Sequence, residues 1–93
     1  MPETFSQKIR VFCDSERIEI PSGFHRHSAS RYALIETSVS PNKLIAKTWF
    51  NQEDVINYLQ QYGADRQFRI LDFKERVEFI LSPTQKLARG NVF

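Results

Sequence analysis

The chain has 93 residues, of which 41% are hydrophobic and 13% aromatic, a composition that suits one packed core and excludes a wholly disordered chain. Its 13 basic and 11 acidic side chains leave a net charge of only +2, so charge alone does not indicate a nucleic-acid-binding protein. One cysteine excludes an intramolecular disulfide, and no apolar run approaches the roughly 18 residues of a membrane-spanning helix.

The first predicted elements are two short strands that form a hairpin. Residues 8–12 and residues 17–20 alternate charged with apolar side chains, which is typical of half-buried strands. Residues 13–16 between them have the small polar side chains of a tight turn. We expect residues 1–6 to be a flexible tail or a docking tail. The side chains expected to face the core are Ile9, Val11, Ile18 and Ile20.

A loop and two further strands follow. Residues 21–30, PSGFHRHSAS, are the least regular part of the chain, and such loops often carry function. Strands are predicted at residues 31–37 and residues 43–50, on either side of a turn at Ser40-Pro41-Asn42. The short turn indicates that these two strands pair antiparallel.

The predicted helix covers residues 51–63 and directly follows a strand. Asn51 can cap its first turn through the side-chain oxygen, and Gly63 can end it in a left-handed conformation. Glu53 and Asp54 place negative charge in the first turn, where the helix dipole favours it. The apolar side chains at helical spacing, which define the face to be buried, are Val55, Ile56, Leu59 and Tyr62.

The last predicted elements are a second hairpin and a tail. Residues 67–73 and residues 76–81 are predicted as strands joined by a turn at Lys74-Glu75. Ser82-Pro83 interrupts this pattern. Residues 84–93 are then a polar tail that is flexible or docks on a partner.

Together these elements predict a small α+β fold. The chain order is β-β-β-β-α-β-β, with a mainly antiparallel sheet of about six strands. The one amphipathic helix packs on one face of the sheet, because its apolar stripe has to be buried. We expect a single domain over residues 1–93, located in the cytoplasm and without membrane contact.

A cluster of two histidines suggests a metal site. His25 and His27 are two residues apart, so an extended backbone points both imidazoles the same way. Cys13 can add a third ligand, or act with a histidine as a nucleophile and base. A structural zinc site usually has four ligands with paired spacing, which this chain lacks. We therefore predict no cofactor and no metal, and name Cys13, His25 and His27 as the residues to test.

A second candidate site combines basic and aromatic side chains. If residues 31–37 pair with residues 43–49, these side chains can share one side of the sheet. Cations beside stacking rings are what single-stranded nucleic acids need for binding. The alternative is that Trp49 belongs to the core and that Glu36 interrupts the basic surface. The members of this predicted basic-aromatic surface are Arg26, His27, Arg31, Tyr32, Lys43, Lys47 and Trp49.

Three functions from different classes fit the sequence. We favour a small non-enzymatic binding or adaptor domain that contacts another protein or a second copy of itself as a homodimer. No catalytic motif is present, and a sheet offers its edges to a partner strand. The first alternative is a nucleic-acid-binding module that uses the basic-aromatic surface. The second is a metal-binding protein or small enzyme centred on Cys13, His25 and His27.

Overall fold

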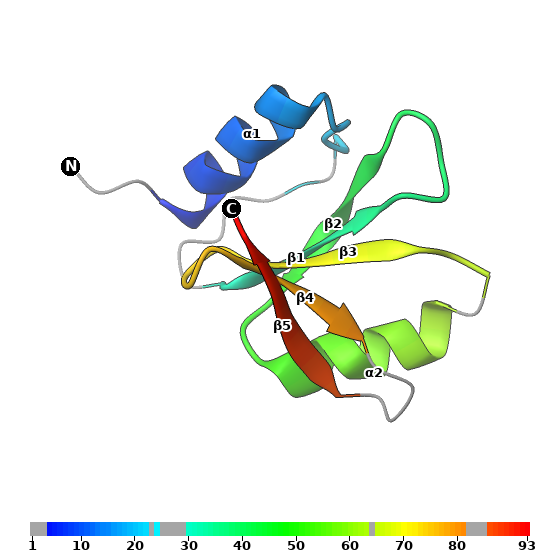
Figure 1. Ribbon diagram of the computed structural model, residues 1–93. Helices are drawn as coiled ribbons and strands as arrows, with labels where there is room; N and C mark the ends of the chain where they lie inside the picture. The colour runs from blue at the N-terminus through cyan, green and yellow to red at the C-terminus, as the bar shows by residue number, and fades with distance from the viewer. Residues whose placement is uncertain (1–3, 23, 25–29, 64, 82–85) are drawn as a thin grey trace.

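In the described part of the chain, five antiparallel strands form one sheet, and a helix lies on each of its faces (Figure 1). The computed structural model describes residues 4–22, 24, 30–63, 65–81 and 86–93. The elements in chain order are α1 (Phe5–Glu16), β1 (Tyr32–Glu36), β2 (Lys43–Trp49), α2 (Gln52–Tyr62), β3 (Phe68–Asp72), β4 (Val77–Leu81) and β5 (Leu87–Val92). Across the sheet the order is β2-β1-β3-β4-β5, so β2 and β5 form the two edges.

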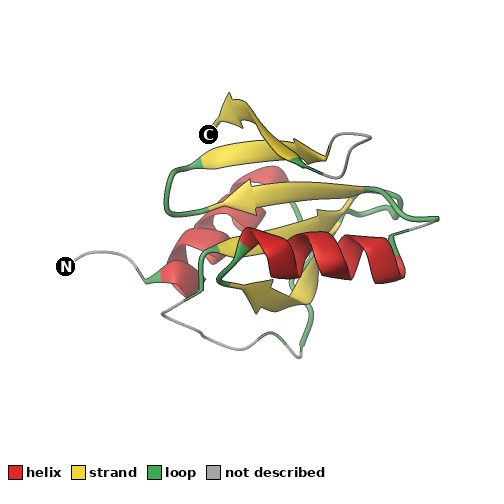
Figure 2. Cartoon of the chain, turned by 90° about the horizontal axis from the view of Figure 1, so that it is seen from below, coloured by secondary structure: helices red, strands yellow, loops and turns green. Residues whose placement is uncertain are grey.

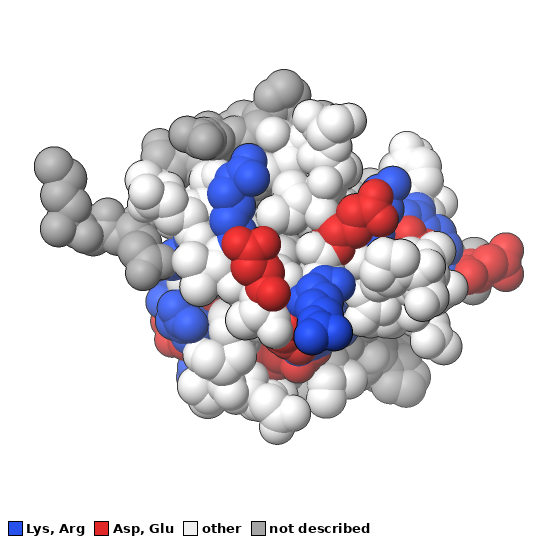
Figure 3. Space-filling view, turned by 90° about the horizontal axis from the view of Figure 1, so that it is seen from above, with Lys and Arg blue, Asp and Glu red and all other residues white. Residues whose placement is uncertain are grey.

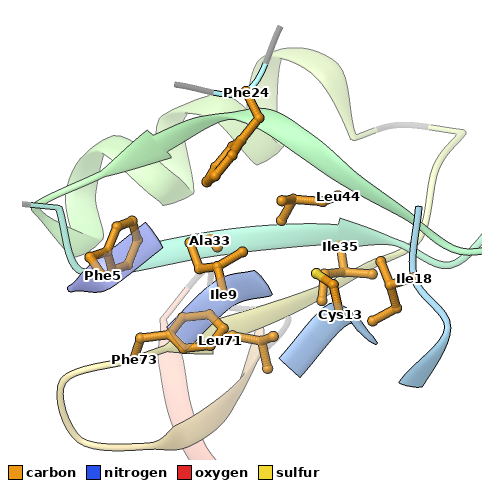
Figure 4. Packing of buried hydrophobic residues seen from close by; sticks show 10 residues of the cluster. All are labelled: Phe5, Ile9, Cys13, Ile18, Phe24, Ala33, Ile35, Leu44, Leu71 and Phe73. Carbon is orange, nitrogen blue, oxygen red and sulfur yellow. The ribbon is translucent and has the colours of Figure 1, made fainter. Parts of the chain in front are cut away.

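The two helices lie on opposite sides of the sheet (Figure 2). Each helix covers its own hydrophobic core, so the sheet separates the two cores. Successive residues of a strand point to opposite faces of a sheet. Leu34 of β1 therefore packs in the core under α2, whereas Ile35 packs in the core under α1, and both are fully buried. Figure 4 shows the α1 core, where Ile9 of the helix lies among side chains of the sheet. The central strand is thus apolar on both faces because both faces are covered.

Helix α1 replaces the first predicted strand, so the prediction of a hairpin over residues 8–20 is wrong. Ile9 is fully buried, whereas Val11 is 62% exposed. A strand would have pointed both side chains toward the core, because residues two apart share a face. The alternating pattern covers only five residues, which is too short to separate a strand from a helix with one buried face.

The start of α1 explains why these residues form a helix. The Thr4 side chain accepts a hydrogen bond from the Gln7 amide, and the Gln7 side chain accepts one from the Thr4 amide. This reciprocal capping box satisfies two amides that the first turn leaves unpaired. Phe5, Ile9 and Cys13 recur every four residues and are buried against the sheet. The predicted tail at residues 1–6 therefore contributes Phe5 to the core.

The second predicted strand, at residues 17–20, is reduced to one bridge. Glu19 pairs in parallel with Lys43 at the outer edge of β2. The Glu19 amide donates to the carbonyl of Asn42 at 2.8 Å, and the Leu44 amide donates to the carbonyl of Glu19 at 2.8 Å. These contacts attach the segment after α1 to the start of β2.

The central unit of strand, turn, strand and helix is confirmed. Strands β1 and β2 pair antiparallel, and α2 begins directly after Asn51. The Asn51 side chain makes no capping hydrogen bond, and Gly63 has φ −96° rather than a left-handed conformation. A Cβ on Gly63 would lie 2.5 Å from the carbonyl oxygen of Leu59, so close approach of the backbone favours glycine there. Both residues mark the helix ends, but for reasons other than those predicted.

The C-terminal region confirms one hairpin and adds a strand. Strands β3 and β4 form the predicted hairpin, and residues of the predicted tail form β5, which pairs antiparallel with β4. The ring of Phe93 then packs against Phe12 and Phe73, with centroids 5.0 and 5.3 Å apart. This part of the tail docks within its own chain. Residues 84 and 85 lie outside the described residues.

The α+β class and the antiparallel sheet are confirmed, and the count of elements differs from the prediction. Within the described residues the order is helix, two strands, helix and three strands, which gives five strands and two helices. Of the six predicted strands, one is a helix and one is a single bridge, which leaves four. The strand β5, which was not predicted, makes five.

Candidate functional site

The structure brings together only part of the predicted basic-aromatic surface. Arg26 and His27 lie outside the described residues. Tyr32 and Trp49 face each other across β1 and β2, but their exposed fractions are only 2% and 5%. Base stacking needs an accessible ring face. These two rings belong to the α2 core instead, as the alternative reading of Trp49 had it.

Arg31 is held by a buried carboxylate. Its Nε and Nη2 atoms donate to Asp72, with a shortest distance of 2.7 Å, and the Asp72 side chain is fully buried. Asp72 also accepts hydrogen bonds from the backbone amides of Lys74 and Glu75. Burial raises the pKa of Asp72, but the bonds from Arg31 and the two amides outweigh it, so this pKa lies below its ordinary value. Arg31 therefore supports the turn between β3 and β4.

The two remaining basic residues of the predicted surface lie on β2. Lys43 is the register partner of Glu36, so it stands beside a carboxylate. Lys47 is exposed and lines a groove beside α2.

On the opposite face of the sheet, which carries α1, basic and acidic side chains are interspersed (Figure 3). The described part of that face carries no continuous basic patch.

Of the three residues of the predicted metal site, only Cys13 lies in the described part of the chain. His25 and His27 lie outside the described part of the chain, and Cys13 is fully buried in the α1 core. Burial, together with the carboxylates of Asp14 and Glu16, raises the pKa of the Cys13 thiol to about 11. A protonated, buried thiol is a poor ligand and a poor nucleophile. Among the residues described, no three histidine, cysteine or acidic side chains are grouped to hold a metal.

A groove of about 400 Å³ lies between the end of β2 and one side of α2. We call it the β2–α2 groove. Residues 47–50 form one wall, and the other wall consists of α2 side chains spaced three and four residues apart, which places them on one side of the helix. The side chains of the helical wall are Asp54, Asn57, Tyr58, Gln61 and Tyr62.

Aromatic rings line the β2–α2 groove from the core to the surface. The centroids of Trp49 and Tyr58 are 5.0 Å apart, and those of Tyr58 and Tyr62 are 4.8 Å apart. Trp49 is buried at the base of this row, whereas Tyr62 is 50% exposed at its end. Phe50 on the opposite wall is 63% exposed. Large apolar surface is therefore open to solvent on both walls.

Polar side chains complete the β2–α2 groove. Asn57 and Gln61 are exposed and carry amides, each of which can donate and accept hydrogen bonds. Lys47 and Asp54 supply one charge of each sign, and neither has an ion-pair partner among the described residues. The groove thus offers apolar contact, hydrogen bonds and both charges to a ligand.

A second hollow of about 400 Å³ lies where β3 and β4 separate. Their pairing ends at Ile70 and Phe79, and the strands diverge beyond these residues. Leu81, on its wall, is followed by residues outside the described part of the chain. The guanidinium groups of Arg66 and Arg69, which also line it, are bound by glutamates at 2.8 and 2.7 Å. The β2–α2 groove is the better candidate, because its charged groups lack such partners within the described residues.

Comparison with known proteins gives no match to a protein-family model, to a curated protein or to a solved structure. None of the helices described is long and apolar enough to cross a membrane.

Most residues of the β2–α2 groove were missed by sequence reasoning. The sequence pattern places Asp54 in the first turn, where the helix dipole explains it, and predicts Tyr62 on the buried face of the helix. A signal was present in the sequence: Asn57 and Gln61, like Tyr58 and Tyr62, are four residues apart and form two adjacent rows on one side of α2. These rows alone do not reveal which element faces them.

Proposed function

We propose that this protein is a small non-enzymatic binding domain that acts through protein contact and holds its partner in the β2–α2 groove. The observation that carries the proposal is the exposure of two large aromatic side chains, Phe50 and Tyr62, on opposite walls of one groove. Exposed apolar surface gathered around a hollow is typical of interaction sites. Aromatic side chains also contribute more binding energy in protein interfaces than most other residue types.

The polar lining of the groove supports a peptide or protein ligand. The amides of Asn57 and Gln61 match the donors and acceptors of a polypeptide backbone. The volume of about 400 Å³ is sufficient for a few side chains. Apolar contact with the rings and hydrogen bonds to the amides are the interactions that hold a polypeptide in such a groove.

Peptide selection tests the proposal directly. Random peptides displayed on phage are selected against the purified chain, and enriched peptides are synthesised and titrated by fluorescence anisotropy. The variant carrying Phe50→Ser and Tyr62→Ser removes the exposed rings, and circular dichroism checks that it is folded. We expect enriched peptides to share a consensus and to bind this variant about tenfold more weakly or worse.

The matched control is Val11→Ser, which removes an equally exposed apolar side chain from α1, on the opposite face of the sheet. It should bind the selected peptides as the wild type does. Equal binding by the wild type, the control and the groove variant would contradict the proposal, and so would a failure to select any peptide. A mass that increases with concentration and falls in the groove variant would identify a second copy of the chain as the partner.

One observation favours nucleic-acid binding as a second candidate function. The exposed ammonium of Lys47 lies in the same groove as the open rings of Phe50 and Tyr62, and single strands bind to such combinations. Binding of a labelled single-stranded oligonucleotide should then weaken as salt is raised, and Lys47→Ala should reduce the salt slope by about one. Lys74→Ala is the control, because Lys74 is exposed outside the groove. Absent or salt-independent binding would dismiss this candidate.

A further inference from the structure

We infer that the ligand of the β2–α2 groove is an extended peptide segment of a partner protein, which pairs with the outer edge of β2 as an additional strand. The inference rests on the proposed function and specifies the conformation of the ligand. Strand addition at a sheet edge is a common form of peptide recognition, in which backbone hydrogen bonds give affinity and alternate side chains give specificity.

Hydrogen bonds of β2 show which of its backbone groups point away from β1. The carbonyl of Trp49 accepts a hydrogen bond from the Arg31 amide, so Trp49 directs its backbone groups inward, toward the chain that leads into β1. The amide of Leu44 donates to the carbonyl of Glu19 on the other side, so Leu44 directs its groups outward. Backbone groups alternate in direction along an antiparallel strand. The amide and carbonyl of Thr48, which precedes Trp49, therefore point to the outer edge, as those of Leu44 do. Between Thr48 and Leu44 the register of β2 with β1 shifts, so the alternation is interrupted over residues 45–47.

The outer edge of β2 already pairs with another segment of the chain at one end. Glu19 occupies its beginning through the parallel bridge to Lys43. In the part of the chain that the structure describes, no strand pairs with the outer edge between Leu44 and Trp49. The intramolecular bridge thus shows that the edge accepts a segment at one end, and Thr48 offers outward backbone groups at the other end.

The length of the β2–α2 groove suits a short extended peptide. The helical wall runs from Asp54 to Tyr62, and these eight steps along α2 give a length of about 12 Å. An extended peptide rises about 3.3 Å per residue, so about four ligand residues lie beside this wall. Two of their side chains, at positions i and i+2, point into the groove. The open rings of Phe50 and Tyr62 favour apolar side chains at both positions.

N-methylation of the selected peptides tests the inference. A methyl group replaces the hydrogen of one backbone amide and removes one donor. In an added strand only every second amide faces β2. We therefore expect N-methylation at alternate peptide positions to weaken binding by about tenfold and N-methylation at the positions between them to have little effect. The amide hydrogen of Thr48 should also exchange more slowly in the complex.

The outcomes separate this inference from the proposed function. Peptides that lose binding to the Phe50→Ser and Tyr62→Ser variant but tolerate N-methylation everywhere would overturn strand addition and leave the groove as the site. A loss at every consecutive position would overturn it too, because it indicates a helical ligand. Alternating sensitivity in peptides that bind the groove variant normally would place the added strand elsewhere and overturn both.

Discussion

The carboxylate of Asp72 links two parts of the chain that are 41 positions apart. It is fully buried and accepts hydrogen bonds from Arg31 and from the turn between β3 and β4. Asp72→Ala leaves the guanidinium and two amides without their acceptor, so we expect the free energy of unfolding to fall by about 3 kcal/mol in urea denaturation. The control is Arg89→Ala, because the pair of Arg89 with Glu75 is exposed and should contribute less than about 1 kcal/mol. Equal losses would contradict the structural role of Asp72.

The carboxylates of Asp72 and Glu36 should make the stability of the fold depend on pH. Hydrogen bonds from Arg66 lower the pKa of Glu36, and the bonds to Asp72 lower its pKa despite burial. A carboxylate whose pKa is lower in the folded than in the unfolded state stabilises the fold at pH values above its unfolded-state pKa of about 4. This stabilisation is lost as the pH falls through the folded-state pKa. We expect the free energy of unfolding to decrease from about pH 4 downward. Asp72→Asn should approach the wild type in stability at low pH; a constant difference would contradict this account.

Cys13 provides a third test at this scale. Its thiol is buried and its pKa is raised to about 11 by burial and by the neighbouring carboxylates, so it remains protonated at neutral pH. Because the thiolate is the reactive form, a chromogenic disulfide reagent should not label the folded chain. In denaturant the reagent should label one thiol per chain. Rapid labelling of the folded protein would return Cys13 to consideration as a catalytic or metal-binding residue.

At the scale of elements, α1 is the clearest departure from the sequence prediction, and one pair of variants tests it. Ile9 is fully buried, whereas Val11, two residues later, is exposed. We expect Ile9→Ala to cost about 2–5 kcal/mol through the cavity that it leaves, and Val11→Ala to cost less than about 0.5 kcal/mol. Chemical denaturation measures both. Similar losses would support the hairpin, in which both side chains face the core.

The reason for this departure lies in the pattern itself. Alternation over residues 8–12 fits a strand, but Phe5, Ile9 and Cys13 fit a helix equally well. The capping box of Thr4 and Gln7 is a local signal that favours the helix. By contrast, α2 combines an apolar stripe with acidic side chains in its first turn, and its predicted position is correct although neither the Asn51 cap nor a left-handed Gly63 forms.

At the scale of the whole molecule, the end of the described chain packs against its beginning. Phe93 lies between Phe12 of α1 and Phe73, and its amide donates to the carbonyl of Arg76. We expect Phe93→Ala to lower the free energy of unfolding by about 1–3 kcal/mol, since the ring is only partly buried. Val92→Ala, at an exposed position, should cost less than about 0.5 kcal/mol. An unchanged denaturation midpoint for Phe93→Ala would indicate a free tail.

The β2–α2 groove also exists only at this scale. Its two walls are neighbours in sequence, but β2 is an edge strand because β1 pairs on its other side with β3, which follows α2 in the chain. The buried residues of α2 are Val55 and Leu59, whereas Tyr62 at its end is 50% exposed. The sequence therefore identified the elements beside the site and not the site itself.

Local sequence patterns predict the α+β class, the hairpin of β1 and β2, the helix α2 and the hairpin of β3 and β4. Each of these depends on residues close in the chain, such as those of a tight turn or of an apolar stripe. Four features depend on packing between distant segments: the helical state of residues 8–12, the strand β5, the ion pair of Arg31 with Asp72, and the exposure of the groove. Burial against distant residues determines these features, and a local pattern carries no information about which distant residues will meet.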